Sequence, residues 1–332
     1  MSQKRSQVEQ ENLKFQKVAL LLGVVLFGLK SAAYIITNSN AILTDALEGL
    51  VNILGAGFGL FSLYYATLPK DENHPYGHGK IEFISSGFEG GLILVAGVSM
   101  IAKAIYTFFF PEEINMNLLG ISLVVIAGIL NTIMGWSMQK QGEKVNSVQL
   151  QAGGKHLLSD GYSTGGLILG LTIVWATDVV ALDNVLAILL GVIISVTGVK
   201  IIRKSIAGVM DEADPDQLNQ VATIVNEQRA SCWVDMHNLK IVRYGAKIHL
   251  DAHLTLPWFF SLQESHEQVN VLEEVLNKAF DNAVEASIHM EPCLPKSCSI
   301  CQFTSCTFRK DEMVKKIEWN GSHLYSSKHH HA

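Results

Sequence analysis

The chain has 332 residues, of which 48% are hydrophobic and 17% are charged, and its formal net charge at pH 7 is −6. Soluble domains average about 25% charged residues, so much of this chain is too apolar for an ordinary soluble protein. The mild net charge says little about partners, and no basic stripe indicates nucleic acid. We therefore expect a membrane protein with no nucleic-acid partner.

Six long apolar segments lie between the start of the chain and Lys204. Each is long enough, at about 20 residues per span, for a helix to cross a lipid bilayer. We expect membrane-spanning helices at residues 18–37, 41–66, 83–109, 117–138, 157–177 and 183–202.

Charged residues return after the sixth segment, and Ala-Asp-Pro-Asp at 213–216 is typical of the start of a helix in a water-soluble domain. The polar and apolar pattern then predicts a helix at 214–229, strands at 237–244 and 247–256, a helix at 261–281 and a strand at 284–290. The expected organisation is a polar N-terminal tail (1–16), a transmembrane α-helical domain (17–206), a cytoplasmic α+β domain (207–292) and a cysteine-rich tail (293–332).

The basic residues predict the orientation of the chain, because short loops rich in Lys and Arg stay on the cytoplasmic side. Lys and Arg lie before the first segment, between the second and third, between the fourth and fifth, and after the sixth. The connections near 37–40, 110–116 and 177–182 contain neither. We expect both ends in the cytoplasm of a bacterium, and the protein in its inner membrane. The polar start is too long for a secretory signal, so the first span is expected to be retained.

Two polar motifs interrupt the second and fifth apolar segments. In the second, Asp45, Glu48 and Asn52 share one helical face, and in the fifth, His156 and Asp160 lie one turn apart. An ionised carboxylate at the centre of a bilayer costs about 2.5–3.5 kcal/mol, so such residues face a bundle interior or a water-filled cavity. Two such faces could enclose one divalent cation.

Two lysines, Lys30 and Lys103, also lie in apolar segments. Their long side chains are expected to reach the membrane surface or to pair with acids such as Glu89. We assign the lysines no ligand role.

A second candidate site lies in the loop after the second apolar segment. Asp71, His74 and His78 stand among Pro and Gly residues that allow the backbone to curl and bring the side chains together. The loop predicts a metal site at the cytoplasmic face, with solvated histidines that bind nothing as the alternative.

Four cysteines lie close together in the tail: Cys293, Cys298, Cys301 and Cys306. A cytoplasmic location argues against stable disulfides, so a structural or sensory zinc site with four thiolate ligands is the first choice. The first three cysteines also match the spacing of plant-type iron–sulfur proteins, so a two-iron cluster is an alternative. Free or redox-active thiols are a further alternative. We expect Cys232 to be a buried core residue.

The ordered set of motifs resembles the cation diffusion facilitator family, whose members are six-span, proton-coupled exporters of divalent metals that work as homodimers. The most specific part is His-Pro-Tyr-Gly-His-Gly-Lys at 74–80, and the resemblance covers most of the chain. It implies that the α+β domain is the family's small αββαβ module, which is similar to metallochaperones and ferredoxin-like folds.

The resemblance also implies a transport site with two ligands from the second span and two from the fifth. His156 and Asp160 match the fifth-span pattern, and the family's spacing places the other two ligands at Glu48 and Asn52, with Asp45 as a further candidate. The family has His or Asp and then Asp at those two positions, so the second span departs from it. An oxygen-rich set favours manganese or iron(II), while zinc stays open.

In the cytoplasmic domain the resemblance implies a regulatory metal near a dimer interface. The corresponding residues are His237, His253, His266, His289 and Glu291. Surface histidines without a metal are the alternative. The histidine run at 329–331 is assigned no role.

These expectations together predict a homodimeric exporter that moves zinc, manganese or iron(II) out of the cytoplasm in exchange for protons. An enzyme is not expected, because no nucleophile constellation or phosphate-binding loop accompanies the polar motifs. The alternative function is a membrane-anchored metal sensor whose cytoplasmic domain and tail bind metal without net transport.

Overall fold

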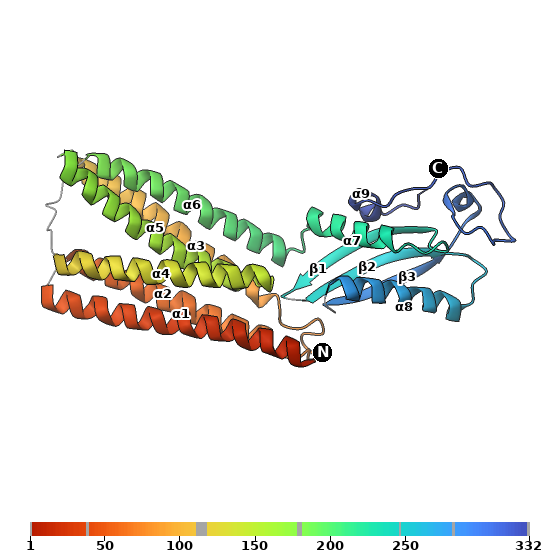
Figure 1. Ribbon diagram of the computed structural model, residues 1–332, viewed down its shortest axis with the longest axis horizontal. Coiled ribbons are helices and arrows are strands. Elements are labelled where there is room, and N and C mark those ends of the chain that lie inside the picture. The colour runs from red at the N-terminus through yellow and green to blue at the C-terminus, as the bar shows by residue number, and fades with distance from the viewer. Residues whose placement is uncertain are drawn as a thin grey trace. The chain divides into compact units, whose positions relative to one another are not determined.

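The structure is a computed structural model that describes residues 2–37, 40–110, 118–177, 181–245, 247–280 and 283–330. The chain divides into two compact units, Met1–Met210 and Asp211–Ala332. Figure 1 shows the helices and strands that make up each unit.

The first unit is a bundle of long helices (Figure 1). Its described elements are α1 (Ser2–Thr37), α2 (Asn40–Ala66), α3 (Ile81–Phe109), α4 (Leu118–Lys144), α5 (Val148–Thr177) and α6 (Ala181–Val209). Each of the six predicted apolar segments falls on one of these helices. The most extensive helix pairs are α3 with α6, α4 with α5, and α1 with α2.

Within the described residues, four helices are long and apolar enough to cross a membrane. These stretches are Gln10–Ala32, Gly49–Ala66, Ile81–Phe109 and Asn184–Val209. Large apolar side chains such as Leu21, Val95, Ile133 and Leu189 are exposed on the outside of the bundle. Large exposed apolar surfaces mark places of contact with a membrane or another protein.

Glycines let α3 and α6 approach closely. A Cβ atom added at Gly97 would lie 2.7 Å from the backbone nitrogen of Ser195, and one added at Gly198 would lie 2.7 Å from that of Leu94. Small residues at such crossings allow the backbones of membrane helices to pack against each other.

The second unit contains α7 (Pro215–Glu227), β1 (Asp235–Tyr244), β2 (Lys247–Leu256), α8 (Leu262–Ala279) and β3 (Val284–Pro292). This order confirms the predicted αββαβ fold. The helix starts follow from their caps: the Asp214 side chain accepts from the backbone of Asp216 and Gln217, and Ser261 forms a capping box with Glu264.

The three strands form a sheet in the order β1-β2-β3, in which β1 and β2 are antiparallel and β2 and β3 are parallel. The register pairs His237 with His253 and His253 with His289. Three histidines therefore form a row across the sheet. Two residues along, Glu291 lies on the same face of β3 as His289, because side chains alternate between the faces of a strand.

The segment after β3 packs into the core of the second unit. It contains a short 3-10 helix, η1 (Pro295–Ile300), and α9 (Gly321–Tyr325). Trp319 and Leu324 are buried in the same core as the side chains of the sheet and its helices. Cys232 also lies in this core, which confirms its predicted burial. The Arg229 guanidinium lies 3.8 Å from the Trp319 ring centroid and donates to the carbonyl oxygen of Ile317 at 2.7 Å.

Candidate metal centres

The predicted ligands of α2 and α5 meet inside the bundle. Asn52 donates through Nδ2 to Asp160 Oδ2 at 2.6 Å, and its Oδ1 lies 2.8 Å from His156 Nε2. His156 is buried. The side chains of Asp45 and Glu48 lie outside the part of the structure that is described, so their ligand roles stay predictions.

A residue of α3, Glu89, joins this group. It is buried, and its Oε2 lies 3.4 Å from His156 Nδ1. Neither of these two atoms makes a hydrogen bond among the described residues. From the sequence, Glu89 was expected only as a partner for lysines. A carboxylate in an apolar helix faces a polar interior, however, and this holds for Glu89 as it does for Asp45.

A small cavity of about 30 Å³ adjoins these side chains. Asn52, Glu89 and His156 line it together with Gln16, Lys30 and Asn131. The space is sufficient for a water molecule or a bare divalent cation. Side chains from three helices therefore offer nitrogen and oxygen atoms to one buried position.

The loop between α2 and α3 brings together the three residues that the sequence singled out. Asp71 Oδ1 lies 3.0 Å from His74 Nδ1, and Asp71 Oδ2 lies 3.3 Å from His78 Nε2. Desolvation acts to raise the pKa of the Asp71 carboxyl, but hydrogen bonds from the backbone and ring of His74 outweigh it and the pKa is lowered. His78 is buried, whereas about half of the Asp71 and His74 side chains is exposed.

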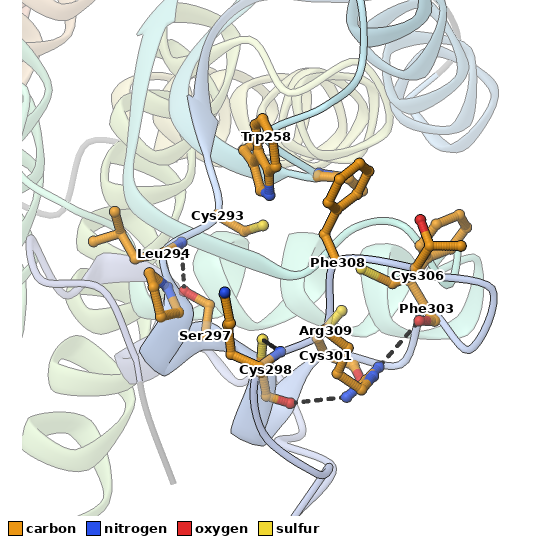
Figure 2. Close-up of a pocket in the computed structure, with 14 residues that line it drawn as sticks. Trp258, Cys293, Leu294, Ser297, Cys298, Cys301, Phe303, Cys306, Phe308 and Arg309 are labelled. Carbon is orange, nitrogen blue, oxygen red and sulfur yellow. Dashed lines mark hydrogen bonds between the residues drawn. The ribbon is translucent and has the colours of Figure 1, made fainter.

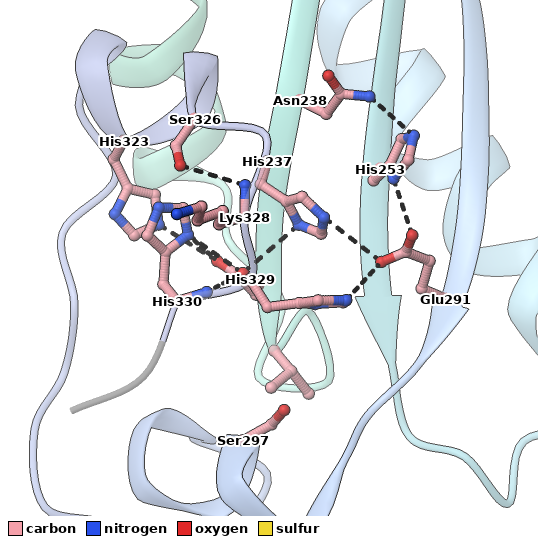
Figure 3. A network of polar contacts seen from close by, with 12 residues as sticks. His237, Asn238, His253, Glu291, Ser297, His323, Ser326, Lys328, His329 and His330 are labelled. Atoms are coloured by element: carbon pink, nitrogen blue, oxygen red, sulfur yellow. Dashed lines mark hydrogen bonds and ion pairs between the residues drawn. The ribbon is translucent and has the colours of Figure 1, made fainter.

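In the second unit, the carboxylate of Glu291 lies close to His237 and His253 of the sheet (Figure 3). Its Oε1 lies 2.8 Å from His253 Nδ1, and its Oε2 lies 3.4 Å from His237 Nε2. His289 is mostly exposed, with Nε2 4.0 Å from Glu291 Oε1. His266 is exposed on α8 and belongs to none of the ligand groups found among the described residues.

Further potential metal ligands, which were not predicted from the sequence, lie beside His237 and Glu291. Asp235 is buried at the start of β1, and His323, His329 and His330 reach it and Glu291 from the C-terminal segment (Figure 3). Asp235 was recognisable from the alternation of a strand, because it lies two residues before His237 and so on the same face. The three histidines had no such signal, since the return of the segment depends on tertiary packing.

The four tail cysteines line one cavity of about 500 Å³ (Figure 2). All four thiols are free. Burial raises the pKa of the Cys293 thiol, and the other three thiols raise it further. In a tetrahedral zinc site the sulfur atoms are roughly 3.8 Å apart. Among the described residues no group of three ligands within 4.8 Å includes a cysteine, so binding of zinc requires the thiols to draw together.

Comparisons with known proteins match both units. Residues 17–210 match the cation efflux transmembrane domain, and residues 213–293 match the cytoplasmic domain of cation efflux proteins. An uncharacterized transporter of Synechocystis sp. is 30% identical over 275 residues, which cover 82% of this chain and 88% of the relative.

Two further relatives have names that state an activity. Metal tolerance protein C1 of Arabidopsis thaliana is 26% identical over 345 residues, which cover 96% of this chain and 71% of that protein. Cation-efflux pump FieF of Serratia proteamaculans is 25% identical over 279 residues, which cover 83% of this chain and 91% of that protein.

The apolar helix bundle and these matches define a membrane transport protein for cations. The chain belongs to the cation efflux family, which is the cation diffusion facilitator family expected from the sequence. Its members are transporters and not conventional enzymes.

Proposed function

We propose that this protein exports a divalent metal cation from the cytoplasm in exchange for protons, through a site between α2, α3 and α5. The observation that carries the proposal is the chain of polar contacts that joins Glu89, His156, Asn52 and Asp160 inside the bundle. Glu48 and Asp45 of α2 are further candidate ligands.

The hydrogen bonds of Asn52 support a cation at this position. An ionised Asp160 only accepts, so the amide end that faces it is the nitrogen, and the amide oxygen faces His156 Nε2. A neutral His156 then carries its proton on Nε2 and points the lone pair of Nδ1 at Glu89 Oε2, 3.4 Å away. Two acceptors that face each other require a proton or a cation between them.

The same geometry supports exchange with protons. Metal binding requires the lone pairs of His156, Glu89 and Asp160, so protons compete with the metal for the same atoms. Protons that enter from the outer face would displace the ion, and the protonated site would carry them back to the cytoplasm. We propose that movement of the helices which carry these residues supplies the alternating access.

The donor set favours manganese or iron(II) as the exported ion, with zinc as the remaining candidate. It offers carboxylate and amide oxygens and only one imidazole, whereas zinc prefers sites richer in nitrogen and sulfur.

We further propose regulatory or structural metal sites outside the bundle. One is the loop group of Asp71, His74 and His78, and another is the sheet group of His237, His253 and Glu291, to which His266 and His289 would contribute in a homodimer. The tail thiols Cys293, Cys298, Cys301 and Cys306 would hold a structural zinc, with an iron–sulfur cluster as the alternative. We place the protein in the inner membrane of a bacterium, with both termini in the cytoplasm.

The test is metal flux into proteoliposomes that hold a pH gradient, measured separately for zinc, manganese and iron(II). We expect gradient-driven flux that is lost in His156→Ala/Asp160→Ala. The matched control is Ser159→Ala, which lies between these residues on α5 and whose hydroxyl donates to the carbonyl oxygen of Lys155 at 2.9 Å. Flux of no ion, with metal still bound by the cytoplasmic unit, would contradict export and favour the membrane-anchored metal sensor.

A further inference from the structure

The C-terminal segment is fixed beside the first strand of the sheet. α9 is capped by the Asn320 side chain, which accepts from the backbone of His323 at 2.8 Å. The segment then runs along β1, where the carbonyl oxygen of Ser326 accepts from the backbone of Asn238 at 2.7 Å. These contacts bring His323 and His330, which are seven positions apart in the sequence, to the same carboxylate of Asp235 (Figure 3).

The distances around Asp235 match a metal coordination shell. Its oxygens lie 3.2 Å from His323 Nε2, 3.1 Å from His330 Nδ1 and 3.5 Å from His237 Nδ1. In a tetrahedral zinc site with bonds of about 2.0–2.1 Å, two neighbouring nitrogen or oxygen ligands are roughly 3.3 Å apart. The potential ligand atoms therefore already lie at the separations that a shared ion imposes.

Two buried side-chain atoms beside this group lack hydrogen-bond partners among the described residues. His237 is buried, and its Nδ1 makes no hydrogen bond with the described residues, nor does Glu291 Oε2. The rings of His323 and His330 are stacked with centroids 3.3 Å apart.

We propose that Asp235, His323 and His330 bind a divalent cation, zinc in the first place, and that this ion fastens the C-terminal segment to the sheet. His329 adds a further imidazole, because its Nε2 lies 3.3 Å from Glu291 Oε2 and its ring centroid 4.5 Å from that of His237. The tail-borne ion would therefore lie next to the sheet group of His237, His253 and Glu291.

The ligands of this ion distinguish it from the metal sites proposed above. Two of the three come from the segment after residue 293, where the match to the family's cytoplasmic domain ends. The inference does not rest on transport, because none of its residues belongs to the helix bundle. It predicts that a metal sets how firmly residues 320–330, the last eleven described residues, are held, and the alternative is a segment held by packing alone.

The experiment compares full-length protein with His323→Ala/His330→Ala in detergent. After equilibration with zinc chloride and removal of free zinc, bound zinc is counted by mass spectrometry. Hydrogen exchange of residues 320–330 is followed with and without zinc. The matched control is Ser322→Ala/Lys328→Ala, which alters two neighbouring side chains of the same segment that do not reach Asp235. Asp235→Asn provides a second variant that keeps the shape of the buried side chain.

We expect both ligand variants to lose about one zinc ion per protomer and the zinc-dependent slowing of exchange at residues 320–330, while the control keeps both. Metal flux should persist in His323→Ala/His330→Ala, so a failure of this inference is distinguishable from a failure of the transport proposal. Unchanged zinc content in both ligand variants would overturn the inference, as would a segment whose exchange is equally slow with and without zinc in the wild-type protein.

Discussion

At the scale of single residues, the candidate transport site combines an amide with charged groups on neighbouring helices. Asn52 Oδ1 faces His156 Nε2, and Glu89 Oε2 of α3 approaches His156 Nδ1 from the other side of the ring. Two ionised carboxylates, Glu89 and Asp160, would neutralise a divalent cation. Neutrality matters here because uncompensated charge in the membrane interior is costly.

The role of Glu89 can be tested by Glu89→Gln, which keeps the size of the side chain and removes its charge. We expect metal affinity at the transport site to fall at least about tenfold, because an anionic ligand becomes a neutral one. The measurement is the metal concentration that gives half-maximal flux in proteoliposomes.

Ser86→Ala is the control for this substitution, since Ser86 lies on the same helix and its hydroxyl oxygen accepts from Ser205 Oγ of α6 at 3.0 Å. Flux by Glu89→Gln at the same half-maximal concentration as Ser86→Ala would show that Glu89 takes no part in binding.

The tail cysteines allow a spectroscopic prediction. Cobalt(II) substituted for zinc should give the charge-transfer absorbance of thiolate ligands, and Cys298→Ser/Cys301→Ser should abolish it. Cys232→Ser serves as the control, since this thiol is buried in the core of the second unit. A visible chromophore in the protein as purified would instead favour the iron–sulfur cluster.

At the scale of elements, the segment after β3 extends the core of the cytoplasmic unit. Trp319 is almost fully buried, and Arg229 lies against its ring while donating to the segment's backbone. Burial lowers the pKa of Arg229 to about 10, although Asp235 and Cys301 act in the opposite direction. The guanidinium therefore stays protonated at neutral pH and continues to hold the segment.

Trp319→Ala should destabilise the cytoplasmic unit by about 3–5 kcal/mol, because it leaves a cavity and removes the partner of Arg229. Trp258→Ala is the matched substitution at an exposed indole, and a loss of about 1 kcal/mol or less is expected there. Chemical denaturation of the full-length protein, followed by near-UV circular dichroism, measures both. Equal losses for the two variants would contradict burial of the segment.

The elements were predictable because their causes are local, whereas parts of the sites were not. Apolar runs predicted the helices, and the polar and apolar pattern together with the helix start at 213–216 predicted the αββαβ order. The extension of α1 back to Ser2 escaped prediction because polar residues continue the helix beyond the apolar run. Glu89 was recognisable as a carboxylate in an apolar helix, but its place beside His156, like that of His330 beside Asp235, depends on tertiary packing.

At the scale of the whole molecule, two units of different solvent preference share one chain. The bundle exposes apolar side chains as a membrane protein does, and the second unit has a buried core built from a sheet and its helices. Each contains its own candidate metal centres, so flux and cytoplasmic metal binding are expected to be separable by substitution.

The most direct measurement records metal entry and internal pH at the same time, in proteoliposomes that contain the protein and start with no pH gradient. A metal gradient alone should drive protons in the opposite direction, and Asp160→Asn should abolish both movements because a neutral amide cannot exchange a proton for a metal. Metal entry without any change of internal pH in the wild-type protein would contradict the account, as would metal entry that Asp160→Asn leaves unaltered.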